Sequence, residues 1–330
     1  MRCASLAIFV TIALRIANPG TVEQGNPGTT LSFIHQHRYA MGTVFDVAIY
    51  HESRAEAARA AGAALDEIVR LDRVLSNFKA DSDLADLLRR GRTDYVAVEP
   101  SLYDVLREAQ SFSRLSNGRF DVTIAPLVGV WTLAASNGRD PSDADIARAR
   151  RCVGYEKIEM AAPDRIRLAS DCVEIDLGGI GKGYAVDRGI EILSKAGIRH
   201  ATISAGGSSI AAVGTPPGRQ GWPVSVGTEG ASHPISLTLR DASISTSSQT
   251  GSSDAGLRGP IVDPRTAAPA ESRTTIGVIA PRATVSDALS TTLLMMSREE
   301  SRTLLARFDG VTAYWISPDG RLESSAPEPR

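Results

Sequence analysis

A glycine-rich bend carries the residues whose types and spacing first suggest chemistry. The stretch EIDLGGIGKGYAVD, residues 174–187, combines an apolar strand ending in Asp176 with four glycines, Lys182 and the start of a helix. Unpaired backbone N–H groups at a helix start, beside a lysine, are suited to bind phosphate. The stretch is not a P-loop, because Tyr184 follows the last glycine, and its spacing is not GxGxxG. The alternative is a glycine bend required by packing alone.

A second pair of candidates lies in the stretch ATVSDALSTTLLMM, residues 283–296. On a helix, Asp287 and Thr291 are four residues apart and project from one face. Their carboxylate and hydroxyl can therefore bind one hard cation such as Mg²⁺. The alternative, which we take as the default from these residues alone, is that Thr284 and Asp287 cap the start of the helix.

Three further stretches carry weaker signals. In PIVDPRT, residues 260–266, Asp263 and Pro264 open a turn, and turn chemistry alone explains both residue types. Phe120 and Asp121 follow the end of a predicted helix, where loops often carry function, although an aromatic residue there is more often part of the core. The stretch SAGGSSIAAVG, residues 204–214, allows close backbone approach but indicates no particular chemistry.

The elements that must position these residues alternate without a regular βαβ order. Apolar residues recurring at three- and four-residue steps predict helices, and alternating or continuous apolar runs predict strands. This mixture favours an α+β fold, with one domain over residues 31–322 and a flexible tail over 323–330. The predicted helices are 53–76, capped by Ser53, 101–116, 184–197 and 284–308. The predicted strands are 44–49, 156–160, 165–169, 173–177, 274–280 and 311–317, and the apolar runs 200–214 and 222–227, broken by glycine pairs, predict sheet with tight turns.

The N-terminal segment, residues 1–30, predicts export. An arginine precedes a twelve-residue apolar run over 3–14, which is too short to span a bilayer but suits the core of a signal peptide, and a flexible Pro-Gly-rich linker follows. We therefore expect a periplasmic or envelope-associated protein, with a cytoplasmic one as the alternative. Cys152 and Cys172 flank a predicted hairpin and, in an exported chain, can form a disulfide; two unpaired, partly buried thiols are the interpretation we favour.

Composition excludes some classes of partner. The chain has 330 residues, 42% of them hydrophobic and 22% charged, with a formal net charge of −2. These values are typical of a folded globular protein. The absence of a basic block argues against binding of nucleic acid or anionic lipid. The sequence specifies no oligomeric state.

Seven stretches taken in order resemble the ApbE family, the FAD:protein FMN transferases. They are YAMGTVFDVAIY, LSNFKADSDLADLL, GRFDVTIAPLVGVW, EIDLGGIGKGYAVD, ISAGGSSIAAVG, IVDPRT and SDALSTTLL. The resemblance covers nearly all of residues 38–316. The resemblance implies a single ApbE-like, T-fold-related domain with a mixed or antiparallel sheet and packed helices. It also implies that FAD is cleaved with Mg²⁺ and that its FMN moiety is transferred to a threonine hydroxyl of a target flavoprotein, with release of AMP.

The resemblance assigns roles to individual positions. Lys182 would act on the diphosphate of FAD, and Ser290 would lie close to the metal. The acceptor would be a subunit of a quinone reductase or Rnf-type complex. The implied FAD contacts are Met41, Phe78, Arg119, Phe120, Asp121, Asp176, Lys182 and Ile261. The implied Mg²⁺ ligands are Asp287, Thr291 and the backbone carbonyl of Gly179.

The chain departs from the family at the block IVDPRT. Relatives commonly have a histidine, the proposed general base, where this chain has Pro260, and a glycine where it has Ala267. Proline accepts no proton, so we expect the proton to go to Asp263, to water or to another group; the spacing of His233 does not support it as a substitute. The alternatives are an FAD-binding or FAD pyrophosphatase relative with weak or no transfer, and a non-catalytic flavin carrier.

Overall fold

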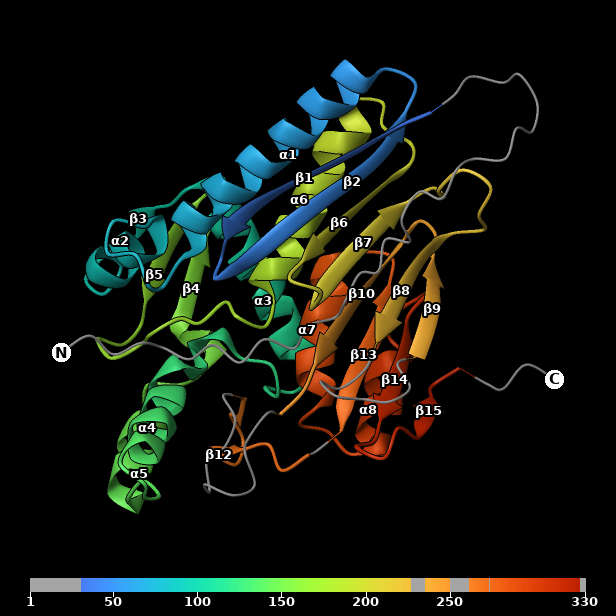
Figure 1. The fold of residues 1–330 in the computed structure, drawn as a ribbon. Coiled ribbons are helices and arrows are strands. Elements are labelled where there is room, and N and C mark those ends of the chain that lie inside the picture. Colours follow the sequence, from blue (N-terminus) through green and yellow to red (C-terminus); the bar gives the residue numbers. More distant parts are fainter. Residues whose placement is uncertain (1–30, 227–234, 250–260, 273, 327–330) are drawn as a thin grey trace.

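The computed structural model describes residues 31–226, 235–249, 261–272 and 274–326, and its largest feature is an eight-stranded sheet (Figure 1). Every neighbouring pair of strands in this sheet is antiparallel. The strands, in spatial order, are β1 (Ser32–Ala40), β2 (Thr43–His51), β6 (Ala201–Ala205), β7 (Ser209–Val213), β10 (Ala242–Ser247), β13 (Thr275–Ala280), β14 (Thr312–Ile316) and β15 (Leu322–Ser324).

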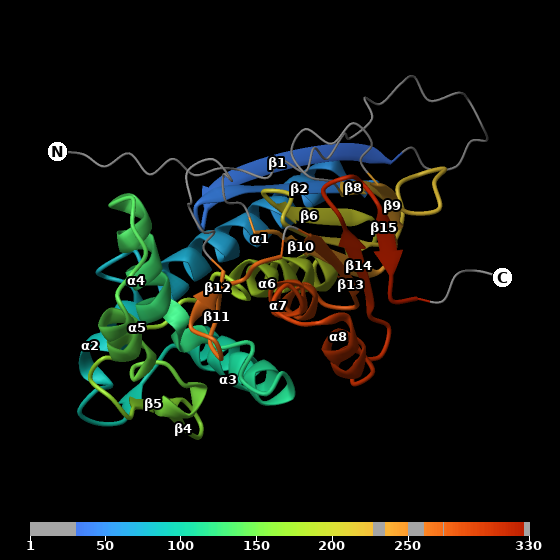
Figure 2. The same cartoon turned by 90° about the horizontal axis from the view of Figure 1, so that it is seen from below.

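Helices cover one face of this sheet. In Figure 2 the sheet runs across the top, and the helices α1 (Arg54–Leu75), α6 (Gly181–Lys195), α7 (Ala283–Leu293) and α8 (Arg298–Leu305) lie beneath it. The opposite face packs against the hairpin of β8 (Trp222–Val226) and β9 (Ile235–Leu239) through a second apolar cluster that contains Trp222 and Ile244. The predicted α+β class is confirmed.

Smaller elements extend the body at one side. A three-stranded sheet of β3 (Val96–Ala97), β5 (Arg165–Leu168) and β4 (Ile158–Ala161) lies beside α2 (Asp83–Arg90) and α3 (Pro100–Leu115). Short 3₁₀ turns, η1 (Val122–Ile124) and η2 (Tyr155–Lys157), connect to them. The helix pair α4 (Ala125–Ser136) and α5 (Asp143–Arg150) packs against the two-stranded β11 (Val262–Asp263) and β12 (Ala268–Pro269) through a third apolar cluster.

Local sequence explains most of these boundaries. The side chain of Ser53 accepts a hydrogen bond from the backbone N–H of Glu56, so α1 begins where the capping residue predicts. The helix then presents alanine and leucine to the core at three- and four-residue steps. Within the described part of the chain, none of the helices has the length and apolar character that a bilayer span requires.

Three predicted elements differ in the structure. The helix expected over 284–308 is two helices, because a capping box formed by Ser297 and Glu300 starts α8 anew. The stretch 173–177 is not a strand; the N–H of Asp176 instead bonds to the carbonyl of Val122, which lies outside any sheet. Strand β1, which we did not predict, pairs with the expected strand at 44–49, and β15 continues past residue 322, where we expected a tail to begin.

The prediction of unpaired thiols at Cys152 and Cys172 is wrong. Their sulfur atoms are 2.14 Å apart and form a disulfide, with Cα atoms 5.2 Å apart. The hairpin of β4 and β5 brings the two cysteines together, because it pairs the chain on either side of its turn. The bond joins the segment after α5 to the segment that leads into the glycine-rich bend.

Candidate active site

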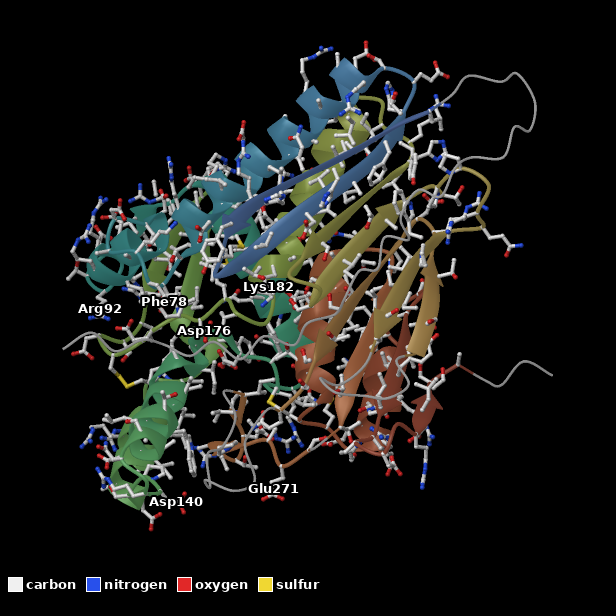
Figure 3. All side chains as sticks on the ribbon, viewed as in Figure 1. Phe78, Arg92, Asp140, Asp176, Lys182 and Glu271 are labelled. Carbon is white, nitrogen blue, oxygen red and sulfur yellow. A yellow bond between two sulfur atoms is a disulfide. The ribbon has the colours of Figure 1, made fainter. Side chains whose placement is uncertain are left out.

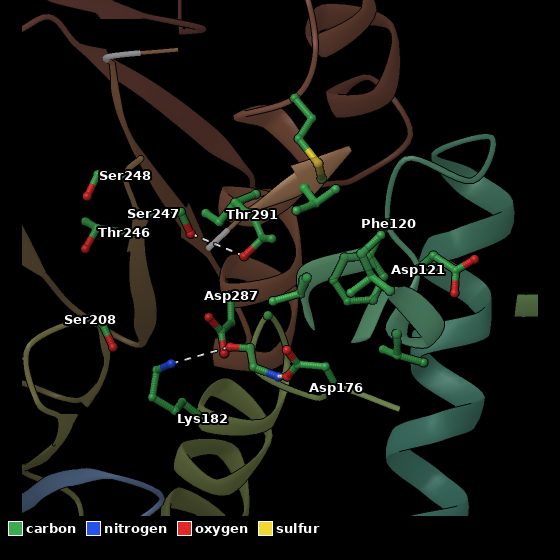
Figure 4. Close-up of a pocket in the computed structure, with 18 of the residues that line it drawn as sticks. Phe120, Asp121, Asp176, Lys182, Ser208, Thr246, Ser247, Ser248, Asp287 and Thr291 are labelled. Atoms are coloured by element: carbon green, nitrogen blue, oxygen red, sulfur yellow. Dashed lines mark hydrogen bonds between the residues drawn. The ribbon is translucent and has the colours of Figure 1, made fainter. Parts of the chain in front are cut away.

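Segments far apart in the sequence enclose a pocket of about 450 Å³, lined in part by the turn between β1 and β2, the loop between β6 and β7 and the end of β10. Figure 4 shows the side chains around it. The pocket gathers most of the predicted site residues, with Phe78 and Asp263 as the exceptions. The predicted residues that line it are Met41, Arg119, Phe120, Asp121, Asp176, Gly179, Lys182, Ile261, Asp287 and Thr291.

A tight turn brings Met41 to the pocket. Strands β1 and β2 pair with Ala40 opposite Thr43, so that only two residues connect them. Both have positive φ, 49° at Met41 and 75° at Gly42, as two-residue hairpin turns of the favoured type require. A methionine in this conformation is unusual, and backbone strain of this kind is found preferentially at functional sites.

The glycine-rich bend allows α6 and α7 to touch. A Cβ atom at Gly183 would lie 2.2 Å from the backbone oxygen of Ala283 and 2.7 Å from the Cβ of Asp287, so no larger residue fits there. This approach lets the N–H of Gly183 donate to Oδ2 of Asp287 at 2.8 Å. Asp287 thereby satisfies an otherwise unpaired N–H group in the first turn of α6.

The interpretation of Thr284 and Asp287 as a capping box is wrong. The start of α7 is instead capped from α6, because Asp187 accepts hydrogen bonds from the N–H groups of Ala283, at 2.7 Å, and Thr284, at 2.9 Å. The side chain of Thr284 also donates to Asp187. Each helix therefore supplies the carboxylate that the other needs at its first turn, which leaves Asp287 facing the pocket.

Asp287 is a carboxylic acid held in an unfavourable place. Only 4% of its surface is exposed, and burial raises its pKa. The positive charge of Lys182, the N–H of Gly183 and the hydroxyl of Ser209 oppose this rise, while the nearby Asp187 adds to it. A buried carboxylate is costly unless it is paired or coordinates a metal.

The groups around Asp287 suit a hard divalent cation. A Cβ atom added at Gly179 would lie 3.2 Å from the hydroxyl oxygen of Thr291. The backbone of Gly179 therefore lies beside the Thr291 hydroxyl. Within the described ranges no group of three His, Cys, Asp or Glu side chains could hold a metal. One carboxylate, one hydroxyl and one backbone carbonyl nevertheless suit Mg²⁺, which usually keeps water and substrate phosphate as its other ligands.

Asp176 and Lys182 lie on either side of the bend. Oδ1 of Asp176 accepts a hydrogen bond from the N–H of Gly178 at 2.7 Å, which fixes the turn that follows the acid. The Lys182 ammonium donates to the carbonyl of Gly178 at 3.4 Å (Figure 4). A cation therefore stands at the first turn of α6, where anions are favoured.

The opposite wall is built around Arg119. Its guanidinium pairs with Oδ2 of Asp263 at 2.6 Å and with Oε1 of Glu300 at 2.9 Å, and it donates to the carbonyl of Met295. Oδ1 of Asp263 accepts from the N–H of Arg265 at 2.8 Å. Both oxygens of Asp263 are thus engaged, and Asp263 is not among the residues that line the pocket, so its role as a catalytic proton acceptor stays a prediction.

Phe120 and Asp121 are buried and stabilise this wall through packing and hydrogen bonds. The Phe120 ring packs edge-on against Phe112, with ring centroids 6.0 Å apart. Asp121 accepts hydrogen bonds from the N–H and hydroxyl of Thr123 and from the N–H of Tyr155. Burial raises the pKa of Asp121, and those three bonds lower it in part. Asp121 thus ties the pocket wall to η2, which follows the disulfide.

The prediction that Phe78 lines the flavin site is not met by this structure. Its side chain is 94% exposed and lies outside the pocket, beside α2 (Figure 3). Pro260 and His233 lie outside the described residues.

Several lining residues were not predicted. Most of them carry hydroxyl groups. Those at the end of β10 had a signal in the sequence, the serine-rich run SISTSS over residues 243–248. Because strand residues alternate between faces, every second serine of this run points toward the same side of the sheet. The unpredicted polar residues are Thr43, Ser208, Thr246, Ser247 and Ser248.

Comparisons with known proteins agree on one family. The model of the ApbE family matches residues 41–315. An FAD:protein FMN transferase from Treponema pallidum (strain Nichols) is 30% identical over 312 residues, covering 87% of this chain and 85% of that protein. A protein of the same name from Klebsiella pneumoniae (strain 342) is 26% identical over 295 residues, covering 85% and 83%.

Solved structures of similar fold cover nearly the whole chain. The flavin transferase ApbE from Vibrio cholerae superposes with a TM-score of 0.77 at 22% identity, covering 90% of this chain and 98% of that one. The ApbE protein from Thermotoga maritima gives the same TM-score, 0.77, at 26% identity, with coverage of 89% and 97%.

Proposed function

The chain belongs to the ApbE family, and from this premise we propose that it is an FAD:protein FMN transferase that uses Mg²⁺. The relatives bear that name. The observation that carries the proposal is the contact of α6 with α7, where a buried carboxylate, a hydroxyl and a glycine backbone meet beside a lysine at one wall of a pocket.

The proposed reaction replaces the phosphoanhydride bond of FAD with a phosphoester bond to the acceptor. The hydroxyl oxygen of an acceptor threonine attacks the phosphorus of the FMN half of FAD, and the bond from that phosphorus to the bridging oxygen breaks. AMP leaves with the bridging oxygen, and the hydroxyl proton passes to a base. Phosphoryl transfer of this kind depends mostly on positioning and on stabilising the charge spread over the phosphoryl oxygens.

The residues of the α6–α7 wall have distinct parts in that reaction. Asp287, Thr291 and the carbonyl of Gly179 would hold Mg²⁺, which when bound neutralises charge on the diphosphate. Lys182 places a second positive charge beside the first turn of α6, where the diphosphate would lie. Met41 and Ile261 offer apolar surface for the flavin.

The proton acceptor in our proposal is solvent water. Asp263 is engaged by Arg119 and by a backbone N–H, so it is not free to take the proton. A positioned general base contributes about 10² to 10⁴ in rate. We therefore propose slow transfer compared with relatives that carry a histidine at position 260.

The engagement of Asp263 by Arg119 and by a backbone N–H also favours hydrolysis as a second candidate function. Where no side chain selects the threonine hydroxyl, water can attack the same phosphorus and yield free FMN and AMP. The protein would then be an FAD pyrophosphatase with weak transfer, and without either reaction it would be a flavin carrier.

We further propose an exported protein that acts on flavoprotein subunits of quinone reductase or Rnf-type complexes. The disulfide between Cys152 and Cys172 supports export, because such bonds persist mainly in oxidising compartments. The acceptor class comes from resemblance to the family alone.

One assay separates these functions. The purified chain is incubated with FAD, Mg²⁺ and an acceptor flavoprotein, and covalent FMN and AMP are measured. Equal amounts of both are expected for a transferase. AMP without labelled acceptor indicates the hydrolase, and neither product together with bound FAD indicates the carrier. An acceptor whose threonine is replaced by valine serves as the control for covalent labelling.

A further inference from the structure

A row of buried hydroxyls fills the interface between β10 and α7. On the strand, Ser243 and Ser245 occupy alternate positions facing the helix, and Ser286 and Ser290 face them one helical turn apart. All four are completely buried. Ser247 continues the row to the pocket, which it lines together with Thr291 (Figure 4). We call these residues, with Ser209 of β7, the serine seam.

The inner branch of the seam leads to Asp287. The hydroxyls of Ser245 and Ser286 are 2.7 Å apart, and that of Ser245 donates to Ser209 at 3.1 Å. The Ser209 hydroxyl in turn lies close enough to the carboxylate of Asp287 to lower the pKa of that group. Since Ser209 accepts from Ser245, its own hydrogen is free to point toward the carboxylate, which when ionised only accepts hydrogen bonds. The branch therefore has a defined direction that ends on the carboxylate.

The outer branch leads to Thr291. The Ser247 hydroxyl lies 3.2 Å from Oγ1 of Thr291 and 2.8 Å from that of Ser290. Ser290 also donates to the backbone carbonyl of Asp287 at 3.0 Å. A hydroxyl that binds a cation does so through an oxygen lone pair, so its hydrogen must point elsewhere. Ser247 lies at the distance at which it can accept that hydrogen.

Such a polar interface is unusual between a helix and a sheet. Buried hydroxyls cost free energy unless hydrogen bonded, and alanine would fill nearly the same volume without that cost. Packing alone therefore does not explain the seam. Its two branches end at Asp287 and Thr291, which supply the carboxylate and the hydroxyl of the pocket wall. This points to a role of the seam in orienting these two side chains.

We propose that Ser209 and Ser247 are positioning residues that orient Asp287 and Thr291 toward a divalent cation with oxygen ligands. The inference rests on the metal site of the proposed function and assigns it an outer shell. Residues that hydrogen bond to metal ligands commonly change metal affinity by about 10- to 100-fold when replaced. We expect effects of that size for Ser209→Ala and Ser247→Ala.

The test measures Mn²⁺ binding by the full chain without FAD, using the electron paramagnetic resonance signal of free Mn²⁺. Ser209→Ala and Ser247→Ala should each weaken binding by about 10- to 100-fold. Ser247→Thr, which keeps the hydroxyl, should retain it. Ser243→Ala is the control: it removes a serine of the same strand as Ser247 that is as fully buried as Ser209, and that is bonded to Ser286 and to the carbonyl of Ala280 but to neither ligand. It should lower thermal stability and leave Mn²⁺ affinity unchanged.

The outcomes separate this inference from the function it rests on. Equal weakening by Ser243→Ala and Ser247→Ala would mean that the seam acts only through packing, and unchanged affinity in both Ser209→Ala and Ser247→Ala would also overturn the proposal. If Asp287→Ala binds Mn²⁺ as the wild type does, the metal site itself is misplaced. Thermal melting of each variant shows whether it is folded.

Discussion

The two walls of the pocket hold buried charges in opposite ways. On the wall formed by α6 and α7, Asp287 is buried, and among the described residues it has no ion-pair partner, so Lys182 and neutral donors alone offset its charge. On the other wall, Arg119 is neutralised by Asp263 and Glu300. Charges that compensate one another maintain shape, whereas an uncompensated charge remains available to a ligand. The comparison therefore assigns chemistry to the first wall and architecture to the second.

The largest effect is expected on the first wall. Asp287→Asn keeps the size of the side chain and removes its charge, so Mg²⁺ loses its carboxylate ligand. Transfer should fall by about 10³-fold, which corresponds to about 4 kcal/mol. Metal-free stability should not fall, because the variant no longer buries an unpaired charge. AMP release and thermal melting measure the two quantities, and a loss of stability without a loss of activity would reverse the comparison.

The second wall should show the opposite balance. Arg119→Met leaves Asp263 buried without its partner, which we expect to destabilise the fold by about 3 kcal/mol. The double variant Arg119→Met with Asp263→Asn is the control, since it removes both charges, and it should recover part of the loss. Urea denaturation measures these differences. Full stability in Arg119→Met would show that this ion pair does not hold the wall.

Loss of the disulfide between Cys152 and Cys172 should also destabilise the second wall. The bond closes a loop of 20 residues in sequence separation, next to the backbone N–H groups that bind Asp121 and Thr123. Replacing both cysteines with serine should cost about 2 to 3 kcal/mol of stability. Reduced wild-type protein provides the comparison and should match the variant in urea denaturation. A variant as stable as the oxidised wild type would contradict this assignment.

A smaller gain is expected at Ala267. This residue has φ of 58°, a conformation that costs an alanine about 1 kcal/mol and costs glycine nothing. Ala267→Gly should therefore stabilise the second wall by about 1 kcal/mol, where its carbonyl accepts from the Trp131 indole. Ala268→Gly, next to it and without positive φ, is the control and should destabilise. Denaturation midpoints of both variants check the sign.

The sequence predicted individual helices and strands better than the contacts between them. The 3.6-residue period and the capping serine predicted α1, and helical spacing correctly placed Asp287 and Thr291 on one face that reaches the pocket. Short-range patterns suffice there because both facts depend on a single helix. The family resemblance added the expectation that this face meets the glycine-rich bend.

Contacts between distant segments were beyond the reach of local patterns. The exchange of capping carboxylates between α6 and α7 depends on Gly183 fitting against Ala283, which no spacing within either helix reveals. Arg119 and Asp263, which pair on the second wall, are 144 residues apart. The serine seam had a local signal, the alternation of residues 243, 245 and 247, but its partners on α7 follow only from the packing of helix on strand.

The most direct test of the central claim is a crystal structure with FAD and Mn²⁺, in which anomalous scattering locates the metal. The account predicts a peak bound by Asp287, Thr291 and the carbonyl of Gly179, at about 2.0–2.2 Å from each oxygen. The diphosphate of FAD should contact the same ion beside Lys182. A metal peak away from these three groups, or a diphosphate bound at the Arg119 wall, would contradict it.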